Sequence, residues 1–319
     1  MNGMTVVFGN GAIGHLVTDA LLARGDAVRI AQRTRPKDLP AGAEYVACDI
    51  LDPAAVRRAV DGAARVLLAV GFPYDARVWR RMWPATMTNV VEACAAAGAR
   101  VVFIDNLYEL GPQTRPRTED MPLAATAGKP LVLAEVTRIW EAARDRVRVA
   151  ALRCPDFYGP GVTVSHLGAS AFGEVAKGKR AQMVVPLDTP HDFAYAPDIG
   201  RAAVTLLDAP DDAYGQPWNV PCAPTRTPRE ILRLGADAIG VPLKTLAVPL
   251  WALPVAGVFS RFMKEVDDVR FTWDRPYVVD SGKFTRRFWS DVTPFEVGAP
   301  ATARAFAAAA VAGAPAGTR

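Results

Sequence analysis

Short apolar runs alternate with longer amphipathic segments along the first half of the chain. Between residues 4 and 153 each apolar run has the length of a buried strand, and the intervening segments carry apolar residues at helical spacing. This alternation is typical of strand–helix–strand units wound around a parallel sheet. The strands that it predicts are residues 4–8, 27–31, 44–48, 65–70, 100–105 and 147–152.

Helix ends are marked by residues with known capping chemistry. Gly25 is placed to end the first helix. Asp52 and Pro53 start a second helix, because an aspartate caps free amides and a proline suits the first turn. Beyond residue 153, where Pro and Gly become dense, helices are predicted at 198–207 after an Asp198 cap and at 228–239 after a Thr227 cap.

Together these patterns predict an α/β fold in two parts. Residues 1–153 are expected to form a Rossmann domain, a doubly wound parallel sheet that binds a dinucleotide. Residues 154–319 are expected to form a small C-terminal substrate-binding lobe, with segments that return to the core sheet.

Composition and charge narrow the functional class. The chain has 319 residues, half of them hydrophobic, and a formal charge of +4 that is scattered rather than gathered into a basic stripe, so we expect no nucleic-acid partner. The apolar stretch 246–259 is broken by prolines and too short for a membrane span, and the amino terminus lacks a secretory signal pattern. We therefore expect no membrane association and a cytoplasmic location.

Cysteines and histidines give no sign of a metal site. The four cysteines are far apart, lie among apolar neighbours and are expected to be buried free thiols: Cys48, Cys94, Cys154 and Cys222. The three histidines have no ligand spacing, so no metal is expected.

A glycine-rich loop follows the first predicted strand and opens the first predicted helix. Gly9, Gly11 and Gly14 form a G-x-G-x-x-G motif in the context that the dinucleotide-binding fingerprint requires. Gly9 permits the tight turn, Gly11 lets the backbone approach a pyrophosphate, and Gly14 allows the helix to pack on the strand. The helix amides, from Ala12 and Ile13 onward, then bind the anion.

The end of the second predicted strand bears on the choice of dinucleotide. An NAD site uses an acidic residue there to bind the ribose hydroxyls, whereas this chain has Gln32, Arg33, Thr34 and Arg35. A guanidinium suits a 2′-phosphate, so NADP(H) is favoured over NAD(H), with Arg33 and Thr34 as its contacts. The alternative is that the two arginines are a solvated loop pair.

Two further strand ends complete the predicted cofactor site. Asp49 can accept a hydrogen bond from the adenine amino group, and Ile50 can cover the adenine ring. Capping of the following turn is a competing role for Asp49. Val70, at the end of the fourth predicted strand, is assigned to the same site.

Several motifs, in order along nearly the whole chain, resemble one enzyme family. Besides the glycine loop, these are residues 90–112, the R-x-x-x-x-Y-G-P turn within 153–162, residues 191–207 and residues 280–298. They resemble the extended and atypical short-chain dehydrogenase/reductases of the epimerase/dehydratase-like branch. The resemblance implies a Rossmann fold, a nicotinamide cofactor and a small-molecule substrate; it leaves open whether the chain forms a homodimer.

The sequence departs from that family at its catalytic motif. The family's Tyr-x-x-x-Lys pair uses the lysine ammonium to lower the pKa of the phenol, which then exchanges a proton with a carbonyl or alcohol oxygen. Lys129 holds the lysine position, where the resemblance implies a contact with the nicotinamide ribose, but Ala125 holds the tyrosine position. A solvated surface lysine is the alternative for Lys129. Asp105 and Asn106 replace the usual Ser or Thr pair, and Asn106 could still donate to a substrate oxygen.

Other side chains could replace the missing phenol or line the substrate pocket. Tyr108, in the loop after the fifth predicted strand, is the first candidate for the proton donor. Tyr158, His191 and Tyr195 are further candidates, assigned with Phe72 to substrate contact; packing in a core is the alternative for each. The aromatic and aliphatic weighting of the pocket segments favours a medium-sized apolar or aromatic substrate.

Three functions remain open at this point. The leading one is an NADP(H)-dependent oxidoreductase that reduces a carbonyl or an activated carbon–carbon double bond. The second is a nucleotide-sugar epimerase or dehydratase, and the third is a non-catalytic NADP-binding sensor, suggested by the missing tyrosine.

Overall fold

The computed structural model describes residues 3–313, which divide into two compact units. The first unit comprises the chain up to Glu109 together with Ala125–Arg153 and Ile199–Trp218. The second comprises Leu110–Ala124, Cys154–Asp198 and the chain from Asn219 onward. The chain passes from the first unit to the second after residue 153, and Ile199–Trp218 returns to the first unit. The units are described separately below.

The first unit is built on a seven-stranded sheet with the order β10-β6-β5-β4-β1-β2-β3. The pairings from β3 to β6 are all parallel. The order reverses between β1 and β4, which is the switch point where doubly wound sheets bind ligands. The strands are β1 (Met4–Phe8), β2 (Val28–Gln32), β3 (Glu44–Ala47), β4 (Ala63–Leu68), β5 (Arg100–Asp105), β6 (Val149–Arg153) and β10 (Gln216–Asn219).

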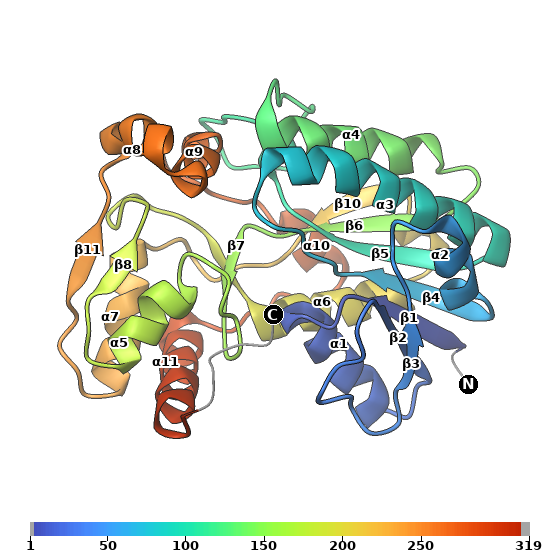
Figure 1. Ribbon diagram of the computed structural model, residues 1–319, viewed down its shortest axis with the longest axis horizontal. Coiled ribbons are helices and arrows are strands. Elements are labelled where there is room, and N and C mark those ends of the chain that lie inside the picture. Colours follow the sequence, from blue (N-terminus) through green and yellow to red (C-terminus); the bar gives the residue numbers. More distant parts are fainter. Residues whose placement is uncertain (1–2, 314–319) are drawn as a thin grey trace. The chain divides into compact units, whose positions relative to one another are not determined.

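Helices cover both faces of this sheet (Figure 1). On one face lie α1 (Ala12–Ala23) and α6 (Ala196–Asp208), and on the other lie α2 (Pro53–Val60), α3 (Ala76–Ala97) and α4 (Gly128–Ala142). Helices α1 and α6 approach closely because α6 carries a glycine at the crossing: a Cβ on Gly200 would lie 3.1 Å from the Cβ of Leu16. The predicted Rossmann fold is therefore confirmed.

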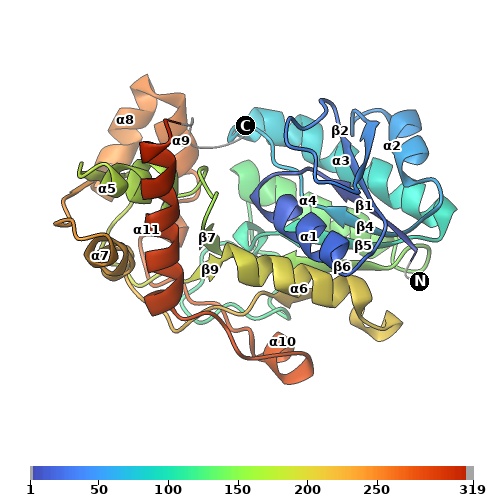
Figure 2. The ribbon, with the colours of Figure 1, turned by 90° about the horizontal axis from the view of Figure 1, so that it is seen from below.

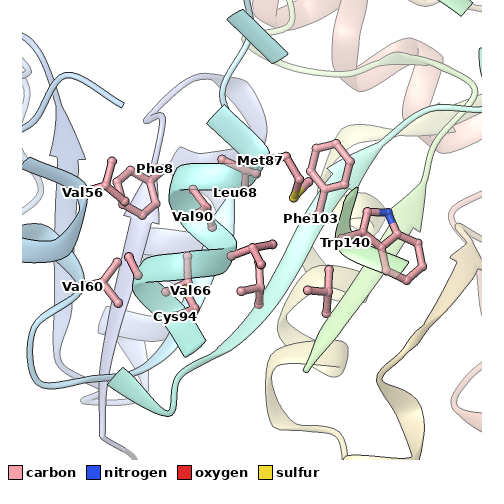
Figure 3. Close-up of a cluster of buried hydrophobic side chains, with 14 of the residues drawn as sticks. Phe8, Val56, Val60, Val66, Leu68, Met87, Val90, Cys94, Phe103 and Trp140 are labelled. Carbon is pink, nitrogen blue, oxygen red and sulfur yellow. The ribbon is translucent and has the colours of Figure 1, made fainter. Parts of the chain in front are cut away.

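The core of this unit lies between the sheet and α2, α3 and α4 (Figure 3). Alternate strand residues such as Val66, Leu68 and Phe103 point to this face, where they meet Met87 of α3 and Trp140 of α4. Each fully buried side chain of this size contributes about 1.5–3 kcal/mol relative to an exposed one. This packing fixes where the strands end, and therefore where their terminal side chains lie.

Most predicted helix ends are confirmed by specific contacts. The Asp52 carboxylate accepts a hydrogen bond from Ala54 N at 2.9 Å, and Thr227 forms a reciprocal capping box with Glu230. Gly25 has a φ of +82°, in the left-handed region that ends helices.

Asp198 is not the cap that the sequence suggested, because α6 begins two residues earlier, at Ala196. The Asp198 carboxylate instead accepts hydrogen bonds from N and Oγ1 of Thr293, at 2.8 and 3.0 Å. It thereby holds the segment that leads into α11 (Phe295–Val311).

The second unit combines short strand pairs with helices. Strands β7 (Asp156–Tyr158) and β9 (Phe193–Tyr195) pair in parallel, as do β8 (Ala181–Met183) and β11 (Thr245–Ala247). Helix α11 packs beside α5 (Gly173–Ala176) and α7 (Pro228–Ala238) (Figure 2). A Cβ on Gly235 of α7 would lie 3.1 Å from that of Ala303, so glycine is what permits this approach. The remaining helices are α8 (Leu253–Phe259), α9 (Arg261–Asp267) and α10 (Gly282–Arg287).

Across residues 3–313, no helix is both long and apolar enough to cross a membrane. The same residues contain no group of three or more His, Cys, Asp or Glu side chains arranged to hold a metal ion. All four cysteines are free thiols; three are buried and Cys222 is half-buried.

Candidate active site

The three glycines of the loop after β1 have different structural roles. Gly9 has a φ of +90°, and a Cβ there would lie 2.7 Å from the carbonyl oxygen of Ala69. A Cβ on Gly14 would lie 1.9 Å from the carbonyl oxygen of Gly9, so this glycine permits α1 to pack on the loop. A Cβ on Gly11 would meet nothing within 4 Å. Gly11 is thus the one of the three whose replacement leaves the packing of the protein unchanged.

The amino terminus of α1 lacks a side-chain cap. Gly11 is its N-cap residue, whereas Asp52, Asp75 and Thr227 cap α2, α3 and α7 through their side chains. The first amides of α1, from Ala12 and Ile13 onward, are therefore available to an anion from outside the helix. The open space above Gly11 and these amides together fit the pyrophosphate of a dinucleotide.

Gln32, the last residue of β2, connects the glycine loop to the segment that follows β2. Its Oε1 accepts a hydrogen bond from Asn10 N at 3.2 Å, and its Nε2 donates one to Thr34 O at 2.7 Å. Arg33 and Thr34 are exposed. Arg35 lies over the ring of Tyr45, with its Cζ 5.7 Å from the ring centroid. Arg33 therefore offers its guanidinium to solvent beside the glycine loop, and Arg35 is partly engaged.

The segments after β3 and β4 carry the other predicted cofactor contacts. Asp49 is exposed, and its Oδ1 accepts a hydrogen bond from Leu51 N at 3.0 Å, so it caps the turn as the alternative interpretation held. Ile50 and Val70 are half-buried against the core of the first unit. Val70 lies outside β4, which ends at Leu68, and its Cα would be 3.0 Å from a Cβ on Gly9.

The end of β5 leads into a capped turn. Asn106 Oδ1 accepts a hydrogen bond from the backbone N of Tyr108 at 2.8 Å, which starts a short 3-10 helix over Tyr108–Leu110. The Asn106 side chain keeps its amide donors, and Tyr108 is half-buried at the margin of the core. Both residues thus follow directly from the carboxyl end of a central strand.

Lys129 is fully buried in the first turn of α4. This helix begins later than the family motif implies. Because α4 begins at Gly128, Ala125 precedes the helix, and its N donates to Glu109 O at 3.2 Å. Residue 125 therefore does not lie one helical turn before Lys129. The Lys129 Nζ instead lies 4.1 Å from the ring centroid of Tyr74, in the loop after β4. The solvated-lysine alternative is wrong.

Phe72 and Tyr74 belong to a row of aromatic rings behind this loop. Phe72 meets Trp83 edge-on at 4.9 Å between centroids, and Tyr74 meets Trp79 edge-on at 5.8 Å. Both tryptophans are on α3 and are nearly buried. The predicted substrate contact Phe72 is therefore half-buried against a rigid aromatic wall.

A cluster of buried charges at the ends of β5 and β6 was not predicted. Asp105 and Arg153 are the last residues of these strands and stand opposite each other in the parallel register. Arg153 Nε lies 2.8 Å from Glu109 Oε1, an ion pair without the alignment of a hydrogen bond. The side chains of Arg153 and Glu109 are 2% and 0% exposed. This buried charge cluster of Asp105, Glu109 and Arg153 combines two acids with a single base.

Burial and mutual repulsion keep a proton in the buried charge cluster. Desolvation raises the pKa of Asp105 to about 6, although Arg153 opposes the shift. Desolvation, with the neighbouring Asp105 charge, raises the pKa of Glu109 to about 8. At pH 7 the cluster therefore contains a protonated carboxyl beside Arg153 and an ionised one. Such perturbed groups at a strand edge are typical of functional sites.

Tyr158 and Tyr195, two predicted substrate contacts, lie in the second unit. Tyr158 is 1% exposed and packs against Phe172 and Phe295, and its hydroxyl has no hydrogen-bond partner among the described residues. Burial raises the pKa of this phenol well above its usual range. Tyr195 is half-buried and packs against Tyr158, with 5.4 Å between the ring centroids. Tyr158 is therefore placed as the alternative interpretation, core packing, describes.

His191, the other predicted contact in the second unit, is fully buried in an aromatic stack. Its ring lies parallel to Trp273 at 3.8 Å and faces Tyr277 at 4.7 Å. The two ring nitrogens meet only acceptors: Thr272 O lies 3.1 Å from Nδ1, and Asp156 Oδ2 lies 3.0 Å from Nε2. Although burial favours the neutral acid, nearby imidazoles hold the pKa of Asp156 below its usual range. His191 is therefore paired with Asp156 within the aromatic stack.

Glu109 and Arg153 are the residues that sequence reasoning missed, whereas Tyr74 was expected in the pocket-forming stretch without a role. The sequence contained one signal: two adjacent strands end in opposite charges, at Asp105 and Arg153. Each of these residues lies two and four positions after core-facing residues of its strand, so its side chain points to the same face of the sheet. Nothing in the sequence indicated that Tyr74 would lie against Lys129, because their contact depends on how α3 and α4 pack.

Comparison with known proteins gives matches at the level of the family and of the fold. The sequence model of the NAD dependent epimerase/dehydratase family matches residues 4–220. No significant match was found among functionally curated proteins.

Among solved structures, a candidate epimerase from Burkholderia cenocepacia has a TM-score of 0.79 at 20% identity, over 96% of this chain and 98% of that one. A UDP-glucose 4-epimerase from Thermotoga maritima, solved with UDP-glucose, has a TM-score of 0.77 at 18% identity over 95% and 98%. A double mutant of the dTDP-glucose 4,6-dehydratase DesIV from Streptomyces venezuelae, solved with NAD, has a TM-score of 0.75 at 19% identity over 95% and 96%.

These structures share the fold of this chain, and the family match extends over the parallel sheet and the glycine loop. The chain belongs to the NAD dependent epimerase/dehydratase family.

Proposed function

We propose that the protein is an NADP(H)-dependent oxidoreductase that reduces a carbonyl or an activated carbon–carbon double bond of a medium-sized apolar or aromatic molecule. The observation that carries this proposal is the glycine loop. It leaves open space above Gly11 and uncapped amides at the start of α1, at the switch point of the sheet. The structure of WbmH from Bordetella bronchiseptica, a fold neighbour, holds NAD+.

The preference for NADP(H) is supported by the end of β2. Gln32 occupies the position where an acidic residue would bind a ribose 2′-hydroxyl, and it is already engaged with Asn10 and Thr34. Arg33 is exposed next to it and can form charge-assisted hydrogen bonds with a 2′-phosphate. Thr34 adds a hydroxyl donor. We propose that the adenine contacts Asp49 and Ile50. Val70 is proposed to contact the cofactor next to the glycine loop.

The residues at the ends of β4 and β5 would orient the reacting groups. Bound nicotinamide supplies the hydride in this chemistry, and the protein supplies binding, orientation and a proton. We assign Lys129 to the nicotinamide ribose, and Asn106 and Tyr108 to contacts with the substrate oxygen. Phe72 would present an apolar surface to the substrate. In the second unit, the half-buried Tyr195 is the predicted contact that we retain as a proposal, whereas Tyr158 and His191 are buried.

The proposal is tested by oxidation of NADPH in the presence of a panel of aldehydes, ketones and enones. We expect turnover with at least one apolar or aromatic member, and a lower KM for NADPH than for NADH. In Arg33→Ala the preference should fall by about tenfold, the value of one charge-assisted contact of about 1.5 kcal/mol. Arg35→Ala is the matched control, because Arg35 already lies over Tyr45. A panel without turnover would contradict the proposal.

A second candidate is a nucleotide-sugar epimerase or dehydratase. The family match favours it, as do two fold neighbours, a UDP-glucose 4-epimerase and a dTDP-glucose 4,6-dehydratase. It requires binding of a uridine or thymidine diphosphate sugar, which calorimetry measures directly. Absence of heat on titration with both sugars would remove this candidate; binding without turnover of the carbonyl panel would favour it.

The cellular setting is also a proposal. Four free thiols suit a reducing compartment such as the cytoplasm. We also propose that the protein forms a homodimer, which sedimentation equilibrium of the purified chain would test.

A further inference from the structure

We propose that Tyr74, from the loop after β4, supplies the phenol that the sequence lacks at position 125, and that it works with Lys129 as the proton donor to a carbonyl oxygen. This inference rests on the proposed function and deepens it, because it selects carbonyls as the substrate class. It goes beyond the family motif, in which the phenol and the lysine come from one helix.

The contact between Tyr74 and Lys129 joins two segments that are far apart in the sequence. Lys129 Nζ lies 4.1 Å from the Tyr74 ring centroid. Positive charge over an aromatic ring is attractive, and the same charge stabilises a phenolate that forms on proton transfer. An ammonium and a phenol ring are thus brought together here by a loop and a helix.

Tyr74 is held in place from behind. Its ring meets Trp79 at 90° with 5.8 Å between centroids, and Trp79 is only 7% exposed. The next residue, Asp75, caps α3 by accepting hydrogen bonds from Arg77 N and Val78 N at 2.8 and 3.3 Å. Both the ring of Tyr74 and the backbone next to it are therefore held in place, as a catalytic group requires. Tyr74 itself is half-buried, so part of it remains accessible.

The loop that carries Tyr74 also runs against the glycine loop. A Cβ on Gly9 would come within 2.7 Å of Ala69 O and 3.0 Å of Val70 Cα. Because β4 lies between β1 and β5 in the sheet, residues 69–75 connect the proposed pyrophosphate site to the amino-terminal ends of α3 and α4. Tyr74 is thus placed at the strand edge where ligands of doubly wound folds bind.

The position of Lys129 is uncommon for a lysine. Its side chain is fully buried, and it stands in the first turn of α4, where the helix dipole disfavours a cation. A catalytic role for the ammonium would explain why the protein tolerates the free-energy cost of burying it there. The contact with Tyr74 gives that charge a defined partner.

A bound reduced nicotinamide would supply the hydride that forms the carbon–hydrogen bond at the carbonyl carbon, and it would be oxidised as the carbonyl is reduced. The proton on Tyr74 Oη passes to the carbonyl oxygen, which yields the alcohol. The resulting phenolate is stabilised by the Lys129 ammonium and recovers its proton from water.

The test compares Tyr74→Phe with the wild-type protein in NADPH binding and in carbonyl reduction. Phenylalanine keeps the ring over Lys129 and the packing on Trp79, and it removes only the hydroxyl. We expect kcat to fall about 100-fold or more, the contribution of a general acid. The KM for the carbonyl and the Kd for NADPH, measured by fluorescence titration, should stay within about threefold of the wild type.

Two further variants separate the alternatives. Tyr108→Phe removes the competing phenol and should lower kcat by less than Tyr74→Phe does. Tyr214→Phe removes a buried hydroxyl bonded to Leu206 O elsewhere in the first unit and should leave kcat unchanged.

Each outcome decides the inference. If the wild type reduces a carbonyl and Tyr74→Phe retains its kcat, or loses less than Tyr108→Phe, the assignment of Tyr74 is overturned while the proposed function stands. If Tyr74→Phe weakens NADPH binding by about tenfold, Tyr74 serves the cofactor and is not the acid. If the wild type reduces only the double bond of enones and no carbonyl, the role of Tyr74 fails while the proposed function stands; if it reduces no member of the panel, both fail.

Discussion

Each unit of the protein contains a buried group of charges, and the two groups are balanced in opposite ways. In the first unit, Asp105 and Glu109 share the single cation Arg153, so burial leaves an excess of acid that is relieved by retaining a proton. In the second unit, the Asp156 carboxylate pairs with the His191 ring, which is enclosed by Trp273 and Tyr277. The first group can exchange a proton near neutral pH, whereas the second is fully paired.

The comparison separates a reactive arrangement from a structural one. The pKa of Glu109 is raised from 4.5 to about 8, so the folded state is favoured below pH 4.5 and this contribution is lost as pH rises toward 8. The pKa of Asp156 is lowered from 3.8, so its contribution is present above that value and is lost as pH falls below it. The buried charge cluster is therefore sensitive to alkali, and the Asp156–His191 pair is sensitive to acid.

The largest effect is expected from Arg153→Met. The substitution leaves two buried acids without their cation, and breaking a buried ion pair in this way costs about 3–5 kcal/mol of unfolding free energy. Urea unfolding at pH 7 measures the loss. Arg148→Met is the matched control: Arg148 pairs with Asp211 on the surface, where an ion pair contributes about 1 kcal/mol or less. Equal losses in the two variants would contradict the assigned burial of the cluster.

His191→Phe is expected to have the next largest effect. Phenylalanine keeps a flat ring between Trp273 and Tyr277 but removes both ring nitrogens, including the one that contacts the Asp156 carboxylate. The loss should be about 2 kcal/mol, the value of hydrogen bonds to a charged group. The Kd for NADPH should not change if His191 is purely structural. A normal stability with altered substrate KM would instead support the substrate contact that the sequence suggested.

Glu109→Gln should change the pH dependence more than the stability itself. In the wild type the free energy of unfolding is expected to fall from pH 6 to pH 8, by about 1–2 kcal/mol, because the folded state binds more protons there. In Glu109→Gln this slope should flatten, since the amide keeps the shape and has no proton to lose. Urea titrations at three pH values measure it. An unchanged slope would place the proton elsewhere.

Strands bounded by strong turn signals could be read from the sequence. Residues 4–8 and 100–105 are strands as predicted, because each apolar run meets a glycine or a polar turn directly. The fourth strand was placed too late, at 65–70, because Ala69 and Val70 are apolar although they leave the sheet to pass Gly9. Apolar character alone does not distinguish a strand from a tightly packed loop.

The chemistry of the site was less accessible to sequence reasoning. The glycine loop and Lys129 are local signals or family positions, and both are where a cofactor could use them. Glu109 and Arg153 were missed because charges at strand ends are usually solvated, and only the packing of the helices over the sheet buries them. The stacking of His191 was not predicted, because its partners, Trp273 and Tyr277, are remote in sequence.

The central claim is that the first unit binds NADP(H) through the loop at Gly11, and NADPH fluorescence titration of the wild type and Gly11→Val tests it most directly. A valine at position 11 meets no atom within 4 Å at its Cβ, so the thermal midpoint should stay within about 2 °C, because no packing is lost. The account predicts tight binding of NADPH, weaker binding of NADH, and loss of both in Gly11→Val. Equal binding of NADPH by the two proteins, or none by the wild type, would contradict it.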